Sequence, residues 1–209
     1  MSEVQCIALS NIDEALNCQE QDNMGGIVPK LIFGFWDDVN VWPAWPVPTA
    51  AGQNQVATPL SLAAAGVITG DVTMKTGTCA YMIEFSADTG SFSIAPQGEQ
   101  GAISFLYALI FINKRIRKLI LGFLNAAKNR KMFFIVQDNN GVWYLMGDKR
   151  RAALLQPSDG AVTGTTPTDI NQVTTIFHYV APRALCYEGD TEDLLTVAVS
   201  NSSQGGVSG

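Results

Sequence analysis

The stretch that decides the fold runs from residue 102 to residue 146. Residues 102–112 read AISFLYALIFI, residues 113–128 read NKRIRKLILGFLNAAK, and residues 131–146 read KMFFIVQDNNGVWYLM. The first segment is apolar except for Ser104. It is too short for a membrane-spanning helix, which needs about 20 residues, and is typical of a buried strand. The three segments predict a strand, a helix and a hairpin in that order.

The middle segment predicts a helix over residues 113–128. Its apolar residues recur in steps of three and one, so they share one helical face. Asn113 is a suitable N-cap, and Asn129 can end a helix in the left-handed conformation. The stripe consists of Ile116, Leu119, Ile120, Phe123, Leu124 and Ala127.

Short β-rich segments surround this helix. Asn140-Gly141 lies between two apolar runs, which is a strong signal for a tight β-hairpin. A second hairpin is predicted from 84–86 to 91–93 and a strand at 173–180, whereas 156–171 reads as a turn-rich loop. The expected fold is mainly β: an antiparallel β-sandwich or barrel with one amphipathic α-helix packed against it, plus long loops or arms.

We expect one structural domain over residues 1–199, followed by a flexible tail at 200–209 (SNSSQGGVSG). An extended loop or arm is predicted at about 35–66. It contains Trp36, Trp42 and Trp45 among prolines, which exclude a helix or a central strand. Two interpretations stay open. This segment packs on its own core, or it docks on a neighbouring subunit, where tryptophan is enriched.

The composition points toward assembly. The chain has 209 residues, with 47% hydrophobic and 15% charged residues and a net charge of −6. Soluble domains carry about 25% charged residues, and disordered chains are far less hydrophobic than this one. A surface with so few charges favours burial against a partner. The start of the sequence does not predict a secretory signal, and the cysteine spacing favours free thiols over disulfides.

The charges are segregated along the chain. Residues 1–112 carry 2 basic and 11 acidic groups, residues 113–151 carry 10 basic and 2 acidic groups, and the remainder carries 1 basic and 6 acidic groups. Basic residues at a helix start oppose the macrodipole. Four explanations stay open: a solvated helix face, an acidic patch on the same chain, an acidic patch on the next subunit, or nucleic acid. The candidate subunit interface is Lys114, Arg115, Arg117, Lys118, Arg130, Lys131, Trp36, Trp42 and Trp45.

Catalytic chemistry has little support. His178 is the single histidine and lies in a predicted strand, where we expect it to be a packed strand residue. No phosphate-binding loop or zinc-ligand spacing occurs, and the acidic pairs lack the spacing of a calcium loop. We therefore expect no catalytic, cofactor-binding or metal-binding residues.

The order of these elements is similar to a known family. An apolar strand and an amphipathic helix lead to a strand, D-N-N-G and an aromatic strand. A Thr/Gly-rich loop at 162–169 follows, then the strand to Tyr179 and Cys186-Tyr187-Glu188-Gly189. Over residues 103–195 this resembles tail tube and related virion structural proteins of tailed phages, particularly those that infect Bacteroidetes.

The resemblance implies a virion tail subunit that is not an enzyme. It implies that copies of the chain form hexameric rings and that these rings stack around a DNA-conducting channel. It also implies assembly in the host cytoplasm. Its expected partners are itself, other virion proteins and, non-specifically, packaged DNA, with no membrane. The alternatives are another virion component (collar, connector or capsid-associated protein), a monomeric β-rich module that binds carbohydrate or protein, and an enzyme with a carboxylate pair.

Overall fold

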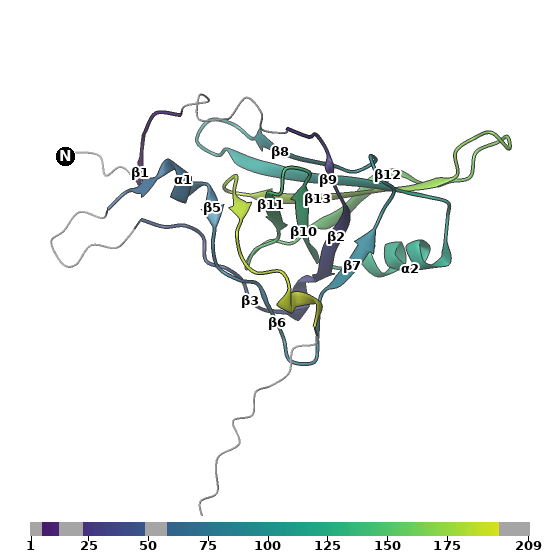
Figure 1. Cartoon of the computed structure of the whole chain (residues 1–209), viewed down its shortest axis with the longest axis horizontal. Helices are drawn as coiled ribbons and strands as arrows, with labels where there is room; N and C mark the ends of the chain where they lie inside the picture. Colours follow the sequence, from purple (N-terminus) through teal and green to yellow (C-terminus); the bar gives the residue numbers. More distant parts are fainter. Residues whose placement is uncertain (1–5, 13–22, 49–57, 197–209) are drawn as a thin grey trace, which may run out of the picture.

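The computed structural model describes residues 6–12, 23–48 and 58–196 and is a β-sandwich with a helix at its side (Figure 1). The expected fold class is confirmed. The elements in chain order are β1 (Ile7–Ala8), β2 (Ile27–Phe35), the 3₁₀ turn η2 (Trp36–Asp38), β3 (Val39–Val41), β4 (Leu60–Ser61), α1 (Leu62–Ala65), β5 (Val67–Ile68), β6 (Thr73–Met74), β7 (Tyr81–Glu84), β8 (Ser91–Gln97), β9 (Ser104–Lys114), α2 (Lys118–Ala127), β10 (Met132–Asp138), β11 (Trp143–Met146), β12 (Leu154–Val162), β13 (Gln172–Ala181), β14 (Cys186–Tyr187) and the 3₁₀ turn η3 (Asp193–Leu195).

Two sheets form the sandwich. The first has four antiparallel strands in the order β12-β13-β9-β8, and the second has six in the order β5-β14-β11-β10-β2-β7. In the second sheet only the β5–β14 pair is parallel. The four-stranded sheet lies above the six-stranded one in Figure 1, and α2 lies at the side of the sandwich.

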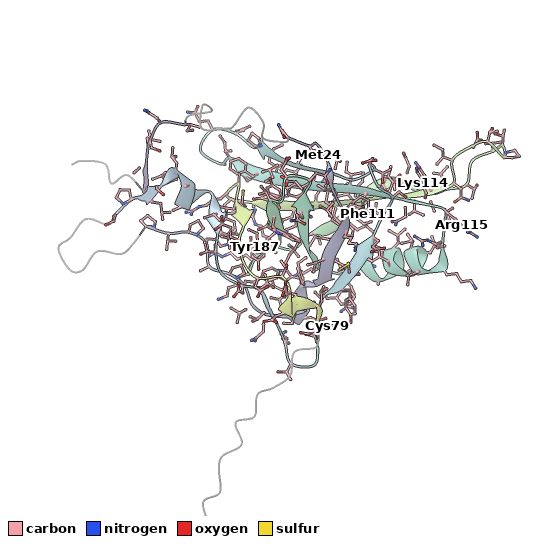
Figure 2. The ribbon with its side chains drawn as sticks, viewed as in Figure 1. Met24, Cys79, Phe111, Lys114, Arg115 and Tyr187 are labelled. Carbon is pink, nitrogen blue, oxygen red and sulfur yellow. The ribbon has the colours of Figure 1, made fainter. Side chains whose placement is uncertain are left out.

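The main core lies between the two sheets. Strands β9 and β13 alternate, so that every second side chain enters this core, as expected for a sheet with one buried face. The rings of Phe134 and Phe177 meet across the interior with centroids 4.4 Å apart. Phe111 lies between the sheets in Figure 2.

Strand β10 is buried on both faces, which explains its unbroken apolar sequence. Phe134 and Val136 face the main core, whereas Phe133 and Ile135 face a second core. That second core is covered by irregular chain and short strands that contribute Val39, Val72, Met74 and Leu194. The predicted hairpin at Asn140-Gly141 is confirmed by the pairing of β10 with β11.

The helix is shorter than predicted, and its predicted caps are wrong. Asn113 belongs to β9, where it is buried and donates from Nδ2 to the carbonyl of Glu84 at 2.9 Å. The β9–β13 ladder continues to Lys114, so sheet pairing takes residues that the periodicity attributed to the helix. Asn129 does not adopt a positive φ, and Leu119, expected in the apolar stripe, is 81% exposed.

Two further expectations about turns are wrong. Residues 84–86 and 91–93 do not pair with each other, because β7 joins the six-stranded sheet and β8 joins the four-stranded one. The turn between them carries the chain across the sandwich, with Phe85 buried in the core. The expected loop at 156–171 is wrong in its first part, because residues 156–162 belong to strand β12, which pairs with β13 out to Val162; residues 163–171 form the loop as predicted.

Candidate functional site

The basic block separates into two clusters in space. The helix-start cluster consists of Lys114, Arg115, Arg117 and Lys118, at the turn between β9 and α2. Figure 2 labels Lys114 and Arg115 of this cluster. The other basic residues of the block follow α2, whose ten residues span about 15 Å. Of the predicted interface cations, Lys114, Arg115, Arg117 and Lys118 thus precede or begin α2, whereas Arg130 and Lys131 follow its end.

The helix-start cluster sits on a rigid turn. Arg115 has a φ of 69°. Its N–H donates to the carbonyl of Asn171 at 2.7 Å, and the N–H of Ile116 donates to Oδ1 of Asn171 at 2.8 Å. The basic side chains of this turn all point to solvent as exposed residues. The backbone that carries these charges is therefore held at a fixed place at the end of the sandwich.

A buried aspartate builds the turn between β11 and β12. Oδ1 of Asp148 accepts hydrogen bonds from the backbone N–H groups of Arg150 and Arg151, and Oδ2 accepts one from the hydroxyl of Tyr179 at 2.7 Å. The carbonyl of Asp148 also accepts a hydrogen bond from the indole N–H of Trp36 at 2.7 Å. This network fixes the backbone that presents three successive cations, Lys149, Arg150 and Arg151.

A cleft opens on each side of this turn. The first, the tryptophan cleft, has a volume of about 670 Å³, and Trp42, Trp45, Lys149 and Arg183 are among the residues that line it. The second, the sheet cleft, has a volume of about 710 Å³ and opens onto the outer face of the four-stranded sheet. Both clefts share Arg150 and Arg151, and the sheet cleft is also lined by Lys131, Leu106, Leu154, His178 and Val180.

The three predicted interface tryptophans are half-buried against their own chain. Trp36 makes the indole hydrogen bond to Asp148. Trp42 packs edge-on against Phe133 with ring centroids 5.8 Å apart, and Trp45 contacts both cores. Residues 36–48 are thus packed on the sandwich, as the first interpretation of the arm expects, while residues 49–57 of the predicted arm lie outside the described residues.

The predicted pair Arg130 and Lys131 contacts aromatic rings. The guanidinium carbon of Arg130 lies 3.4 Å from the ring centroid of Phe35, and Nζ of Lys131 lies 4.9 Å from that of Trp36. These cation–π contacts hold both side chains at the end of β2. The structure therefore brings Lys131 together with the Trp segment, and separates both from the helix-start cluster.

Little negative charge offsets the clefts. Across residues 6–12, 23–48 and 58–196, one ion pair forms, between Lys30 and Glu84 at 3.5 Å. Asp148 is the one acid that lines either cleft, and its carboxylate is already engaged by three donors. Both clefts therefore keep a positive local charge on a chain whose net charge is −6.

The outer face of the four-stranded sheet carries no charged side chain over its central rows. Ile110 pairs with Ser91 and Ile176, Ala108 with Ser93 and His178, and Leu106 with Ala95 and Val180. The apolar members of these rows belong to neither core and remain partly exposed. An antiparallel sheet that faces water normally alternates apolar and polar sides, so this face is unusual for a monomer.

The β12–β13 hairpin projects from the sandwich at the right of Figure 1. Residues 161–171 are all exposed. The tip is nevertheless ordered: Oδ2 of Asp169 accepts hydrogen bonds from the N–H groups of Thr165 and Thr166 at 2.6 and 2.7 Å. The bonds from Thr166 and Thr165 hold the pKa of Asp169 below its usual value. Its glycines and threonines predict only a loop, so no local signal in the sequence indicates this projection.

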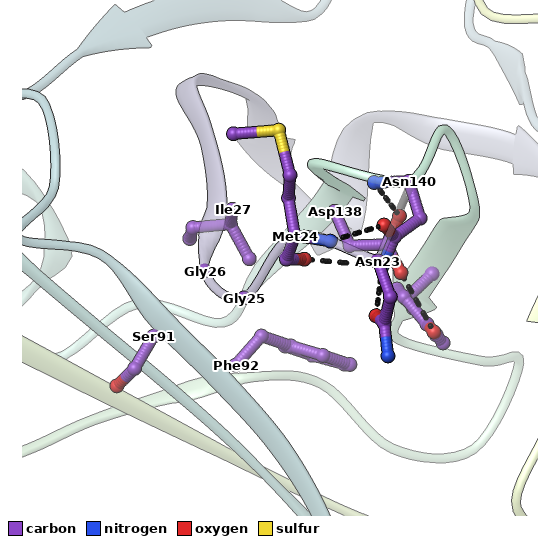
Figure 3. Close-up of a pocket in the computed structure, with 10 residues that line it drawn as sticks. Asn23, Met24, Gly25, Gly26, Ile27, Ser91, Phe92, Asp138 and Asn140 are labelled. Carbon is purple, nitrogen blue, oxygen red and sulfur yellow. Dashed lines mark hydrogen bonds between the residues drawn. The ribbon is translucent and has the colours of Figure 1, made fainter. Parts of the chain in front are cut away.

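A smaller pocket of about 300 Å³ lies where the chain enters β2 (Figure 3). Its polar groups bind one another. Asn140 accepts a hydrogen bond from the N–H of Met24 at 2.8 Å, and Asp138 accepts from the N–H groups of Asn140 and Val142. Few donors or acceptors remain for a ligand, so this pocket serves to fasten residues 23–26 to the β10–β11 hairpin.

His178 lies in strand β13 as predicted, but it faces outward, opposite Ala108 and Leu154, and lines the sheet cleft instead of packing into a core. Within the described ranges, no three His, Cys, Asp or Glu side chains gather where they could hold a metal ion. No helix of that same part of the chain has the length and apolar character needed to cross a membrane.

Comparisons with protein-family models, with curated proteins and with solved structures found no match to this chain.

Proposed function

We propose that this protein is a virion structural subunit that resembles a phage tail-tube protein and assembles with copies of itself into rings around a DNA-conducting channel. One observation carries the proposal: the uncharged, partly apolar outer face of the sheet β12-β13-β9-β8. The resemblance in element order and the sandwich with a flanking helix agree with it.

The face has the chemistry of an interface between subunits. Its centre is formed by Leu106, Ile110 and Ile176, and its edge strand β8 contributes the small residues Ser91, Ser93 and Ala95. Small side chains beside branched ones allow another flat surface to approach closely. Burying such rows against a second copy removes apolar area from water at about 25 cal/mol per Å².

The face is large enough to form most of a subunit contact, provided that another surface contributes additional buried area. Four strands at about 4.8 Å spacing are about 19 Å wide, and the ten paired residues of β9 and β13 at about 3.3 Å are about 33 Å long. The resulting area, about 600 Å² per copy, is somewhat below the roughly 800 Å² per partner of a standard interface. The projecting β12–β13 hairpin supplies additional surface that can reach a neighbour.

The test replaces an apolar residue at the centre of the face. Ile110→Lys adds a charge at a half-exposed position, so we expect the fold to be kept and self-association to fall at least tenfold. Ala126→Lys, on the exposed side of α2, is the matched control and should assemble like the original protein. Light scattering across protein concentration gives the mass, and negative-stain microscopy shows rings and their symmetry.

The outcomes separate the candidate functions. Hexameric rings or tubes support the tail-tube function. A closed ring with a symmetry other than sixfold supports a collar, connector or capsid-associated component. A protein that stays monomeric at high concentration contradicts the proposal. A binding module is then favoured by one observation, the tryptophan cleft with Trp42 and Trp45 in its wall.

A further inference from the structure

We propose that the tryptophan cleft is the docking site for the acidic loop 188–193 of a second copy of this chain. This inference rests on the proposed function, since it names one contact through which subunits associate. The partner is identified by its chemistry: an ordered loop with several exposed carboxylates, which this chain itself carries.

The basic side of the contact has side chains that make no polar contact within the described part of their own chain. Lys149 and Arg150 are exposed, and neither side chain forms a hydrogen bond or ion pair with the described residues. Their backbone is nevertheless fixed, because Oδ1 of Asp148 accepts hydrogen bonds from the N–H groups of Arg150 and Arg151. A fixed backbone limits the entropy lost on binding an anion to the rotamers of the two side chains, which favours a specific contact over a diffuse one.

The walls of the cleft strengthen ion pairs formed inside it. Trp42, Trp45, Pro43 and Pro182 line the cavity beside the cations. A bound segment displaces water from these apolar surfaces, and the lower local dielectric increases the attraction between opposite charges. The guanidinium of Arg183, which donates to the carbonyl of Pro46, adds a further cation to this wall.

The acidic side is an ordered loop after β14. The N–H of Asp190 donates to Oδ1 of Asp71 at 2.8 Å, and the N–H of Glu192 donates to Oδ1 of Asp190 at 2.8 Å. These bonds shape the loop and leave other carboxylates unused. Glu188 and Glu192 are exposed, and their side chains bind no partner within the described residues.

Within the described residues of one chain, the two surfaces form no ion pair with each other. The one ion pair of the described residues involves neither of them. Each copy of the chain carries one cleft and one acidic loop, so a second copy provides one binding partner for every cleft. Nucleic acid is the less favoured occupant, because a net charge of −6 repels a polyanion at long range.

Charge reversal with rescue tests the contact. The variants Lys149→Glu/Arg150→Glu and Glu188→Lys/Glu192→Lys change only exposed side chains, so circular dichroism and the thermal midpoint should stay unchanged. Each should weaken self-association at least tenfold in sedimentation velocity at 0.1 M salt. All four substitutions in one chain restore the net charge and should restore association, as should a mixture of the two variants.

A matched control separates local pairing from overall charge. Glu188→Lys/Glu192→Lys combined with Lys114→Glu/Lys118→Glu has the same net charge as the rescued chain, but the reversed cations lie in the helix-start cluster. We expect this combination to remain defective. Rescue by it would overturn the assignment of the cleft.

The remaining outcomes also decide. If the original protein forms rings and Lys149→Glu/Arg150→Glu forms them equally well, this inference is wrong and the proposed function stands. If the original protein does not self-associate at any concentration, both are wrong. Tight binding of a fluorescent 20-nucleotide single-stranded DNA that Lys149→Glu/Arg150→Glu abolishes, with self-association unchanged, assigns the cleft to nucleic acid instead.

Discussion

The hydroxyl of Tyr179 donates a hydrogen bond of 2.7 Å to Oδ2 of Asp148. It connects the end of β13 to the turn that presents Lys149, Arg150 and Arg151, so the four-stranded sheet and the cationic turn are positioned together. Both groups are buried, with Asp148 7% and Tyr179 3% exposed. Buried polar groups of this kind are costly to leave without a partner.

Removing this hydroxyl should destabilise the protein. Tyr179→Phe leaves the Asp148 oxygen without its side-chain donor, and we expect a loss of about 1–3 kcal/mol in the free energy of unfolding. Urea unfolding measures it. The comparison variant is Tyr81→Phe, at a residue that is 52% exposed, and it should change stability by less than about 0.5 kcal/mol. Equal stabilities of the two variants would contradict the importance of this bond.

Removing a different buried hydroxyl, in the main core, should stabilise the protein. Oγ1 of Thr175 has no hydrogen-bond partner in the described structure, and the residue is 0% exposed. Thr175→Val has nearly the same shape and removes an unsatisfied polar atom. We expect the free energy of unfolding to rise by about 1 kcal/mol. Thr174→Val, at the neighbouring half-exposed position, is the control and should gain less; a less stable Thr175→Val protein would show that the hydroxyl is satisfied.

Stability should fall in alkaline solution. Burial raises the pKa of Tyr107 to about 12, despite the hydrogen bond from the N–H of Leu185. The unfolded chain ionises first, near pH 10, so this contribution is complete below pH 10 and is lost as the pH rises toward 12. The expected loss is about 1.4 kcal/mol per pH unit for each such tyrosine. Urea unfolding between pH 9 and 11.5 gives the slope, and Tyr107→Phe should reduce it.

The local signals predicted those parts of the fold in which neighbouring residues decide the structure. The apolar run of β10 and the Asn140-Gly141 turn are of this kind. The helical periodicity places Asn113 at the helix start, because it cannot reveal the ladder with Val173 that extends β9. The turn at 87–90 carries ordinary hairpin residues, and only the burial of Phe85 between the sheets decides that its flanking strands separate.

The candidate surfaces depended even more on distant contacts. The cationic residues were visible in the sequence, but Trp42, Lys149 and Arg183 line one cleft although they are far apart in the chain. The outer sheet face was hidden because β9 is apolar on both sides. An alternating pattern predicts a solvated face, and an unbroken apolar run predicts burial inside the domain.

The start of α2 gives a prediction that separates stability from interaction. Arg117 is the N-cap, with φ −126° and ψ 150°, and it makes no capping bond. Asp accepts a hydrogen bond from the first turn and favours the positive end of the helix dipole, so Arg117→Asp should raise the free energy of unfolding by about 1 kcal/mol over Arg117→Ala. Urea unfolding compares the two, and equal values would contradict this cap geometry. Arg117→Asp can be more stable than Arg117→Ala and still assemble less well than the original protein in light scattering. In that case Arg117 serves a contact with another molecule, because it does not stabilise its own helix.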